Sequence, residues 1–156
     1  MKTPMNVFNT AMKKKKKNRK GFSLVELIVV LVIMAILAAA LVPTLIGYIR
    51  QTRQSNAKNE AAQAVQAAQT ITSSAFASPD KTYVNQTPDG SNVVFADFNT
   101  FPDNAYDTVE ALAEVNDATG QGVTDVEIAD AVVTKLVYIA ENGDTVKYES
   151  GQYTVQ

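Results

Sequence analysis

The sequence contains no cysteine, no histidine and no tryptophan among its 156 residues. Without cysteine there is neither a disulfide nor a thiol nucleophile, and without histidine there is neither a Ser-His-Asp triad nor an imidazole metal ligand. If the chain were an enzyme tethered to a membrane, its catalysis would have to use carboxylates alone. No arrangement of acidic residues in the sequence suggests such an active site. We expect no catalytic residue, no cofactor and no metal site.

Charge is distributed very unevenly along the chain. Eight of the 14 lysines and arginines lie at or before Lys20, seven of them in residues 13–20, and no acidic residue precedes Glu26. Residues 22–156 keep six basic and all 16 acidic side chains, a formal charge of −10. A basic run can bind nucleic acid, but one that adjoins an apolar span is typical of a segment retained in the cytoplasm. The acidic remainder predicts no specific nucleic-acid partner.

A long apolar segment follows the basic run. Between Leu27 and Ile49 there are 23 residues without a charge, which as a helix would be roughly 35 Å long, enough for a hydrocarbon core of about 30 Å. A secretory signal peptide cleaved near Ala38-Ala39-Ala40 is one alternative, although its apolar part is usually shorter and carries no acid. An uncleaved single-span anchor is another. Pro43 lies inside the run, where it removes one helical hydrogen bond.

Residues 20–26 read Lys-Gly-Phe-Ser-Leu-Val-Glu, and with the following apolar run they resemble the type III signal of type IV pilins and pseudopilins. The resemblance implies that residues 1–21 are a leader, removed by a prepilin peptidase after Gly21, and that the new N-terminal residue, Phe22, is N-methylated. Translation from Met12 instead of Met1 would leave this signal intact. The absence of cysteine resembles the pilins of Gram-positive bacteria.

The resemblance also implies how the mature chain is used. Residues 22–49 would cross the cell membrane once, with the N-terminus in the cytoplasm, and would later form the core of a helical filament at the cell surface. Glu26 would pair with the Phe22 amine of a neighbouring copy, and the helix near Pro43 can lose its regular turn in filaments. The implied partners are copies of the chain, the prepilin peptidase, and the pilus assembly platform with its ATPase machinery.

Residues 50–78 are predicted to form an amphipathic helix. The chain leaves the membrane just before it, with Tyr48 at the interface and Arg50 and Arg53 marking the exit to water. Small and apolar residues recur at spacings of three and four, which places them on one side of a helix. Polar residues, among them Gln69, fall mainly on the other faces. We expect a sheet to pack on the apolar stripe, with a free coiled coil as the alternative, and the helix to end at Ser78-Pro79-Asp80. The stripe comprises Ala57, Ala61, Ala64, Ala68, Ile71 and Ala75, flanked by Val65, Thr72 and Phe76.

Residues 79–156 are predicted to form a small globular head. Strands are expected at 93–98, 132–140, 145–149 and 153–155, with hairpin turns at 141–144 and at Ser150-Gly151. A short helix is expected at 107–115, with Asp107 as its N-cap and Glu110 completing a capping pattern. The last three strands form an antiparallel meander, extended to four by an earlier strand. The fold class is α+β, a long N-terminal helix packed on a small antiparallel sheet, which is the plan of pilins and pseudopilins.

Several acidic residues of the head raise the question of calcium, which some pseudopilins bind. None follows the spacing of an EF-hand loop, so we expect a solvated acidic face. The sequence therefore predicts a structural subunit, the major pilin of a type IV pilus. A pseudopilin of a type II secretion or competence DNA-uptake system is the alternative. The acidic residues concerned are Asp97, Asp103, Asp125, Glu127 and Asp130.

Overall fold

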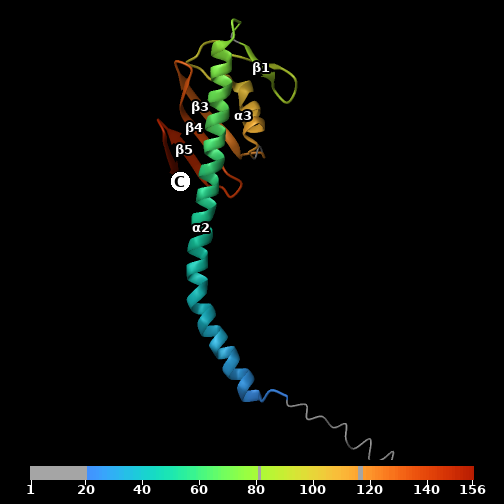
Figure 1. The fold of residues 1–156 in the computed structure, drawn as a ribbon, viewed down its shortest axis with the longest axis vertical. Coiled ribbons are helices and arrows are strands. Elements are labelled where there is room, and N and C mark those ends of the chain that lie inside the picture. The colour runs from blue at the N-terminus through green and yellow to red at the C-terminus, as the bar shows by residue number, and fades with distance from the viewer. Residues whose placement is uncertain (1–20, 81, 116–117) are drawn as a thin grey trace, which may run out of the picture. The chain divides into compact units, whose positions relative to one another are not determined.

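The computed structural model describes residues 21–80, 82–115 and 118–156. The basic run at residues 13–20 and the possible start at Met12 lie outside this described part. The first element of the described residues is the helix α2 (Leu24–Ala77). The chain divides into two compact units, residues 1–46 and residues 47–156, and each is described by itself below. Figure 1 labels the elements along the chain.

The second unit is built around the C-terminal part of α2. All six residues of the predicted stripe are buried, with exposed fractions of 0–1%. They share one hydrophobic core with residues of the sheet, among them Val133, Leu136 and Val146, so the expected packing of sheet on helix is confirmed. Figure 1 shows this green part of α2 beside strands β3, β4 and β5. Small side chains on the stripe let the two layers approach closely.

The sheet has four antiparallel strands in the order β3-β4-β5-β6. They are β3 (Gly122–Ala129), β4 (Val132–Ile139), β5 (Thr145–Glu149) and β6 (Gln152–Val155). The predicted meander of the last three strands is confirmed. The fourth strand, β3, was not predicted, and the expected strand at 93–98 does not join this sheet. The predicted central strand, 132–140, is β4, which lies between β3 and β5.

Two β-bulges interrupt the pairing of β3 with β4. Thr124 is the extra residue on β3, between the pairs Val123↔Tyr138 and Asp125↔Val137, and Thr134 is the extra residue on β4. Each bulge shifts the alternation of inward and outward side chains by one residue. Val123 and Val126 therefore both face the core, although their spacing of three does not fit a regular strand.

The strands are joined by tight turns. Gly143, with φ 86°, closes the β4–β5 turn, and Ser150 with Gly151 closes the β5–β6 turn, as expected. The β3–β4 turn consists of Asp130 and Ala131. Both have positive φ, a conformation that residues other than glycine rarely adopt.

Gln69 of α2 holds the β3–β4 turn. Its Nε2 donates to the carbonyl oxygen of Ala131 at 3.0 Å, and its Oε1 accepts from the N–H of Val133 at 2.8 Å. Gln69, expected on a face other than that of the apolar stripe, therefore still contacts the sheet. An amide side chain has both a donor and an acceptor, so it can satisfy a carbonyl of the turn and an N–H of the strand that follows.

A separate hairpin consists of β1 (Thr82–Gln86) and β2 (Asn92–Val94), of which β1 was not expected. The predicted strand 93–98 is too long, because the chain leaves the pairing after Val94. Phe95 turns into the core, where its ring lies 5.7 Å from that of Phe98 and 5.8 Å from that of Phe101. Phe76, predicted to flank the buried stripe, is 63% exposed and packs edge-on against Phe98.

A short helix, α3 (Tyr106–Ala113), follows a single 3-10 turn, η1 (Asp103–Ala105). The helix begins one residue before Asp107 and ends before the predicted residue 115. Asp107 is not its N-cap: that position is Ala105, which makes no side-chain capping bond. Since η1 already gives Ala105 a helical backbone, no capping side chain is needed at the junction. Glu110 accepts a hydrogen bond from the backbone of the sheet.

Candidate assembly site at the N-terminal helix

The N-terminus of α2 is capped by a reciprocal pair of hydrogen bonds. The backbone N–H of Ser23 donates to Oε2 of Glu26 at 3.2 Å, and the N–H of Glu26 donates to Oγ of Ser23 at 3.2 Å. This is a capping box, in which two backbone donors without helical partners are satisfied by side chains. Glu26 therefore has a role within its own chain.

Glu26 also carries a negative charge in the first turn of α2. Such a charge is favourable at a helix N-terminus because the backbone N–H groups there carry partial positive charge. In the part of the chain that the structure describes, the other carboxylate oxygen, Oε1, has no hydrogen-bond partner. The same side chain can therefore cap its own helix and still accept a bond from another group.

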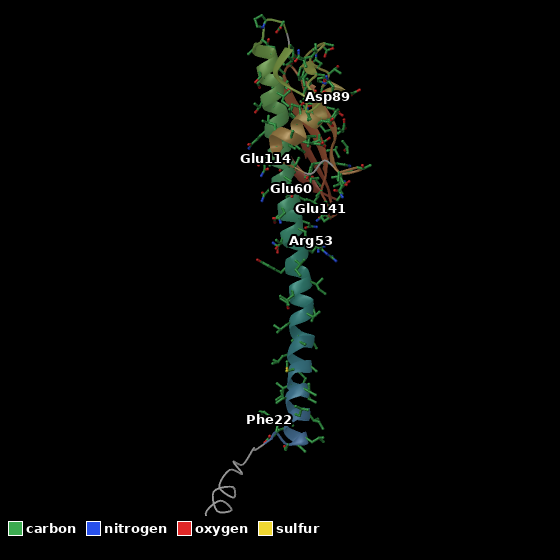
Figure 2. The ribbon with its side chains drawn as sticks, turned by 90° about the vertical axis from the view of Figure 1, so that its right-hand side faces the viewer. Phe22, Arg53, Glu60, Asp89, Glu114 and Glu141 are labelled. Carbon is green, nitrogen blue, oxygen red and sulfur yellow. The ribbon has the colours of Figure 1, made fainter. Side chains whose placement is uncertain are left out.

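Gly21 and Phe22 precede the helix and are both exposed, Phe22 to 89%. A Cβ atom added to Gly21 would meet no atom within 4 Å. The chain's own packing therefore does not require glycine at this position. Any such requirement has to come from a molecule that binds around residues 21 and 22. Figure 2 labels Phe22 at the start of the helix.

No residue in the apolar segment of α2 is buried within the described part of the chain. Every large apolar side chain between Leu24 and Ile49 is exposed, with fractions from 49% at Ile49 to 76% at Leu24. The helix is long and apolar enough to cross a membrane. A helix that is apolar on all sides has to be covered by lipid or by other helices.

Pro43 lies inside α2, and the backbone is helical on both sides of it. Proline has no N–H, so the carbonyl of Ala39 lacks its usual helical donor. Oγ1 of Thr44 lies 3.5 Å from the carbonyl oxygen of Ala40, one residue further on, which is a weak contact. In this single chain the helix keeps its regular turn at Pro43. The loss of that turn remains a prediction for the assembled filament.

Sequence reasoning missed the role of Ser23. The signal was present, because Ser-x-x-Glu directly before an apolar run is the sequence pattern of a capping box. It was overlooked because Glu26 was interpreted only through the resemblance to pilins.

Three of the acidic residues considered for calcium have partners within the head. Asp125 and Glu127 both form ion pairs with Nζ of Lys135, at 2.9 and 2.6 Å. Oδ1 of Asp97 accepts a hydrogen bond from the N–H of Asn99. Across residues 21–80, 82–115 and 118–156, no three acidic side chains are placed to hold a metal ion.

Residues 16–42 match the family model of the prokaryotic N-terminal methylation motif. Searches of curated proteins and of solved structures find no match to the chain. One long N-terminal helix with a four-stranded antiparallel sheet is an α+β arrangement like that of type IV pilins. The chain therefore carries the type IV prepilin signal, followed by a long apolar helix.

Proposed function

We propose that the chain is the major structural subunit of a type IV pilus. The observation that carries this proposal is the apolar segment of α2, whose large side chains are all at least 49% exposed. Before assembly, a membrane covers this surface, with the N-terminus in the cytoplasm and the head outside. After assembly, the same segments of other copies cover it.

Processing comes first in the proposed sequence of events. The prepilin peptidase removes residues 1–21, and Phe22 becomes a methylated N-terminal amine. Residues 22–49 then form the filament core, residues 50–78 connect it to the head, and residues 79–156 coat the outside. The assembly platform and its ATPase extract each subunit from the membrane.

Glu26 is the proposed contact between subunits in the core. In a low-dielectric layer, the attraction between its carboxylate and the Phe22 amine of a neighbour is far stronger than in water. The free Oε1 supports this role, because the capping box engages only Oε2. Pairing satisfies two groups that are costly to bury alone and fixes the axial position of one subunit against the next.

The proposal is tested on filaments sheared from cells that express the chain. Mass spectrometry of the purified filaments should find this chain as the main protein, beginning at N-methylated Phe22. Filaments that lack the chain, or a chain that still carries residues 1–21, would contradict the proposal. Mature protein that stays in the membrane, while secretion or DNA uptake depends on it, would favour the pseudopilin alternative.

A further inference from the structure

A cavity of about 400 Å³ lies between α2 and the β4–β5 turn. Its walls carry three charged side chains, which belong to Arg53 and Glu60 of α2 and to Glu141 of the turn. Figure 2 labels these three residues in one part of the second unit. The cavity therefore brings charges of both signs together. Its other lining residues are Asn56, Ala57, Ala140 and Asn142.

The three charged groups keep bonding capacity that the chain does not use. In the described residues, the guanidinium of Arg53 and the carboxylate of Glu141 have no hydrogen bond or ion pair. Glu60 uses Oε2 alone, which accepts a hydrogen bond from the hydroxyl of the buried Tyr138 at 2.9 Å. Arg53 precedes Glu60 by seven residues, about 10 Å along α2. A ligand of this cavity can therefore meet a cation at one point and carboxylates at another.

The cavity lies shortly after the last apolar residue of the segment, Ile49. Arg53 follows Ile49 by four residues, about 6 Å along α2, and Glu60 follows it by 11 residues, about 16 Å. The headgroup layer on each side of a bilayer is about 5–7 Å thick. Helical side chains tilt toward the N-terminus of their helix, so both side chains tilt toward that layer. In a membrane-bound subunit, Arg53 thus lies at the depth of the lipid phosphates, and the carboxylate of Glu60 lies on their water side.

We propose that this cavity binds the headgroup of a zwitterionic phospholipid with a primary ammonium, of the phosphatidylethanolamine class. Arg53 binds the phosphate, since a guanidinium offers two parallel N–H donors to phosphate oxygens. Glu141 and the unused Oε1 of Glu60 accept hydrogen bonds from the ammonium, which the headgroup carries beyond its phosphate. The inference rests on the proposed function, because it concerns the mature subunit before extraction. The bound lipid holds the head at the membrane surface during that stage.

The chemistry of the cavity distinguishes this headgroup from other common ones. A phosphatidylglycerol headgroup is anionic and brings no cation to the two carboxylates. A phosphatidylcholine headgroup carries a cation without N–H groups, so it cannot donate hydrogen bonds to Glu60 or Glu141. A primary ammonium supplies both the positive charge and the donors.

Lipid selection by the mature chain, residues 22–156, tests the proposal. The chain is inserted into nanodiscs made of equal parts of phosphatidylethanolamine, phosphatidylcholine and phosphatidylglycerol, and native mass spectrometry identifies the lipid that stays bound after release. Phosphatidylethanolamine should be retained in preference to the other two. Arg53→Gln and Glu141→Gln should each lower its retention about tenfold or more, because each removes a charged hydrogen-bonding partner. Arg50→Gln and Glu149→Gln, matched changes of exposed residues outside the cavity, should retain it.

Glu60→Gln separates the cavity from the stability of the fold. Glutamine can still accept the hydrogen bond from the Tyr138 hydroxyl, so the contact between α2 and β4 is kept while one negative charge is lost. This variant should unfold in urea near the wild-type midpoint and should still lose retention of phosphatidylethanolamine. Full retention in the folded variant would contradict the role given to Glu60.

The remaining outcomes are equally decisive. Equal retention of phosphatidylethanolamine and phosphatidylcholine, or unchanged retention in every cavity variant, overturns the proposal, because the lipid then covers only the apolar helix. A preference for phosphatidylglycerol also overturns it and assigns Arg53 to anionic lipids. Normal insertion and normal filaments without lipid selection contradict this inference alone. A mature chain that does not insert into nanodiscs contradicts the proposed function itself.

Discussion

The carboxylate of Glu110 on α3 accepts a hydrogen bond from the backbone N–H of Val123 on β3 at 2.6 Å. Three residues further along β3, the N–H of Val126 donates to the Tyr106 hydroxyl at 3.3 Å. Both N–H groups belong to β3, the edge strand of the four-stranded sheet in the described residues. Side chains of α3 thus occupy backbone donors that would otherwise invite another strand to pair.

Removing this edge bond should destabilise the head. Glu110 is only 7% exposed, so Glu110→Ala leaves the N–H of Val123 buried without an acceptor, a loss of about 1–3 kcal/mol. Urea unfolding of residues 47–156, which contain every buried residue of the described chain, measures the change. Glu110→Gln keeps an acceptor oxygen and should lose less. Equal losses in both variants would show that the negative charge matters more than the bond.

The core under the sheet gives a second stability prediction. Leu136 on β4 is fully buried, so Leu136→Ala should lower the free energy of unfolding by about 2–5 kcal/mol. Val132 lies on the same strand but is 54% exposed, and Val132→Ala should change it by less than about 1 kcal/mol. Similar losses for the two variants in the same urea experiment would contradict the assignment of Leu136 to the core.

Ser23 and Glu26 allow the capping role of Glu26 to be separated from its charge. Glutamine can still accept the N–H of Ser23, so Glu26→Gln preserves the capping box but removes the negative charge. We expect Glu26→Gln to be cleaved and to stay in the membrane with few or no filaments, because loss of one partner of a buried ion pair costs about 3–5 kcal/mol.

Ser23→Ala is the complementary variant. It removes one bond of the capping box, which costs about 0.5–2 kcal/mol, and keeps the charge of Glu26. We expect it to assemble close to normally. Filament yields and N-terminal sequencing, in cells without a wild-type copy, compare the two variants. Normal assembly of Glu26→Gln together with failure of Ser23→Ala would assign the role of Glu26 to capping alone.

Gly21 gives a prediction about processing. Because a Cβ atom at this position meets nothing in the chain, Gly21→Ala and Gly21→Val should leave the fold unchanged. A peptidase that fits closely around the residue before the cleaved bond should reject the larger side chain. We expect uncut Gly21→Val precursor in the membrane and none in filaments, by immunoblot and N-terminal sequencing. Recovery of Gly21→Val protein that begins at Phe22 would refute this expectation.

The turn between β1 and β2 gives a prediction about pH. Hydrogen bonds from the Thr87 hydroxyl and from the N–H and hydroxyl of Ser91 lower the pKa of Asp89 from 3.8 to about 2. A carboxyl group with a lowered pKa contributes stability that is present above its unfolded pKa and is lost as the pH falls through the folded value.

We therefore expect the difference in unfolding free energy between wild type and Asp89→Asn to be constant above about pH 4 and to shrink toward about pH 2. Carboxyl NMR of residues 47–156 should place the titration midpoint of Asp89 near 2. A midpoint at the ordinary value of 3.8 would show that the turn bonds do not form in solution.

Sequence patterns predicted the parts of the fold whose signals are local. The spacing of Ala57, Ala61 and Ala64 identified the buried side of α2, and glycine at 143 and 151 identified two turns. The apolar run and the signal around Gly21 and Phe22 led to the pilin type, which the family model supports. The roles of Gly21, Phe22, Glu26 and Pro43 and the Gram-positive resemblance stay predictions.

Other parts depend on contacts that no local pattern reveals. The predicted strands omitted β3 because its bulge at Thr124 disrupts the alternation of Val123, Val126 and Ile128. The start of α3 was misplaced because a 3-10 turn, rather than the side chain of Asp107, leads into the helix. Glu110 was assigned to its own helix because its partner, Val123, is 13 residues away in the sequence.

Gln69 has a mechanical consequence for the head. Its two hydrogen bonds join α2 to backbone groups 62 and 64 residues away, one on the β3–β4 turn and one at the start of β4. The Tyr138 hydroxyl, further along β4, donates to Oε2 of Glu60 on the same helix. The alanines of the buried stripe have no polar side chain to resist sliding of the sheet along α2, so these hydrogen bonds fix the position of the sheet along its helix.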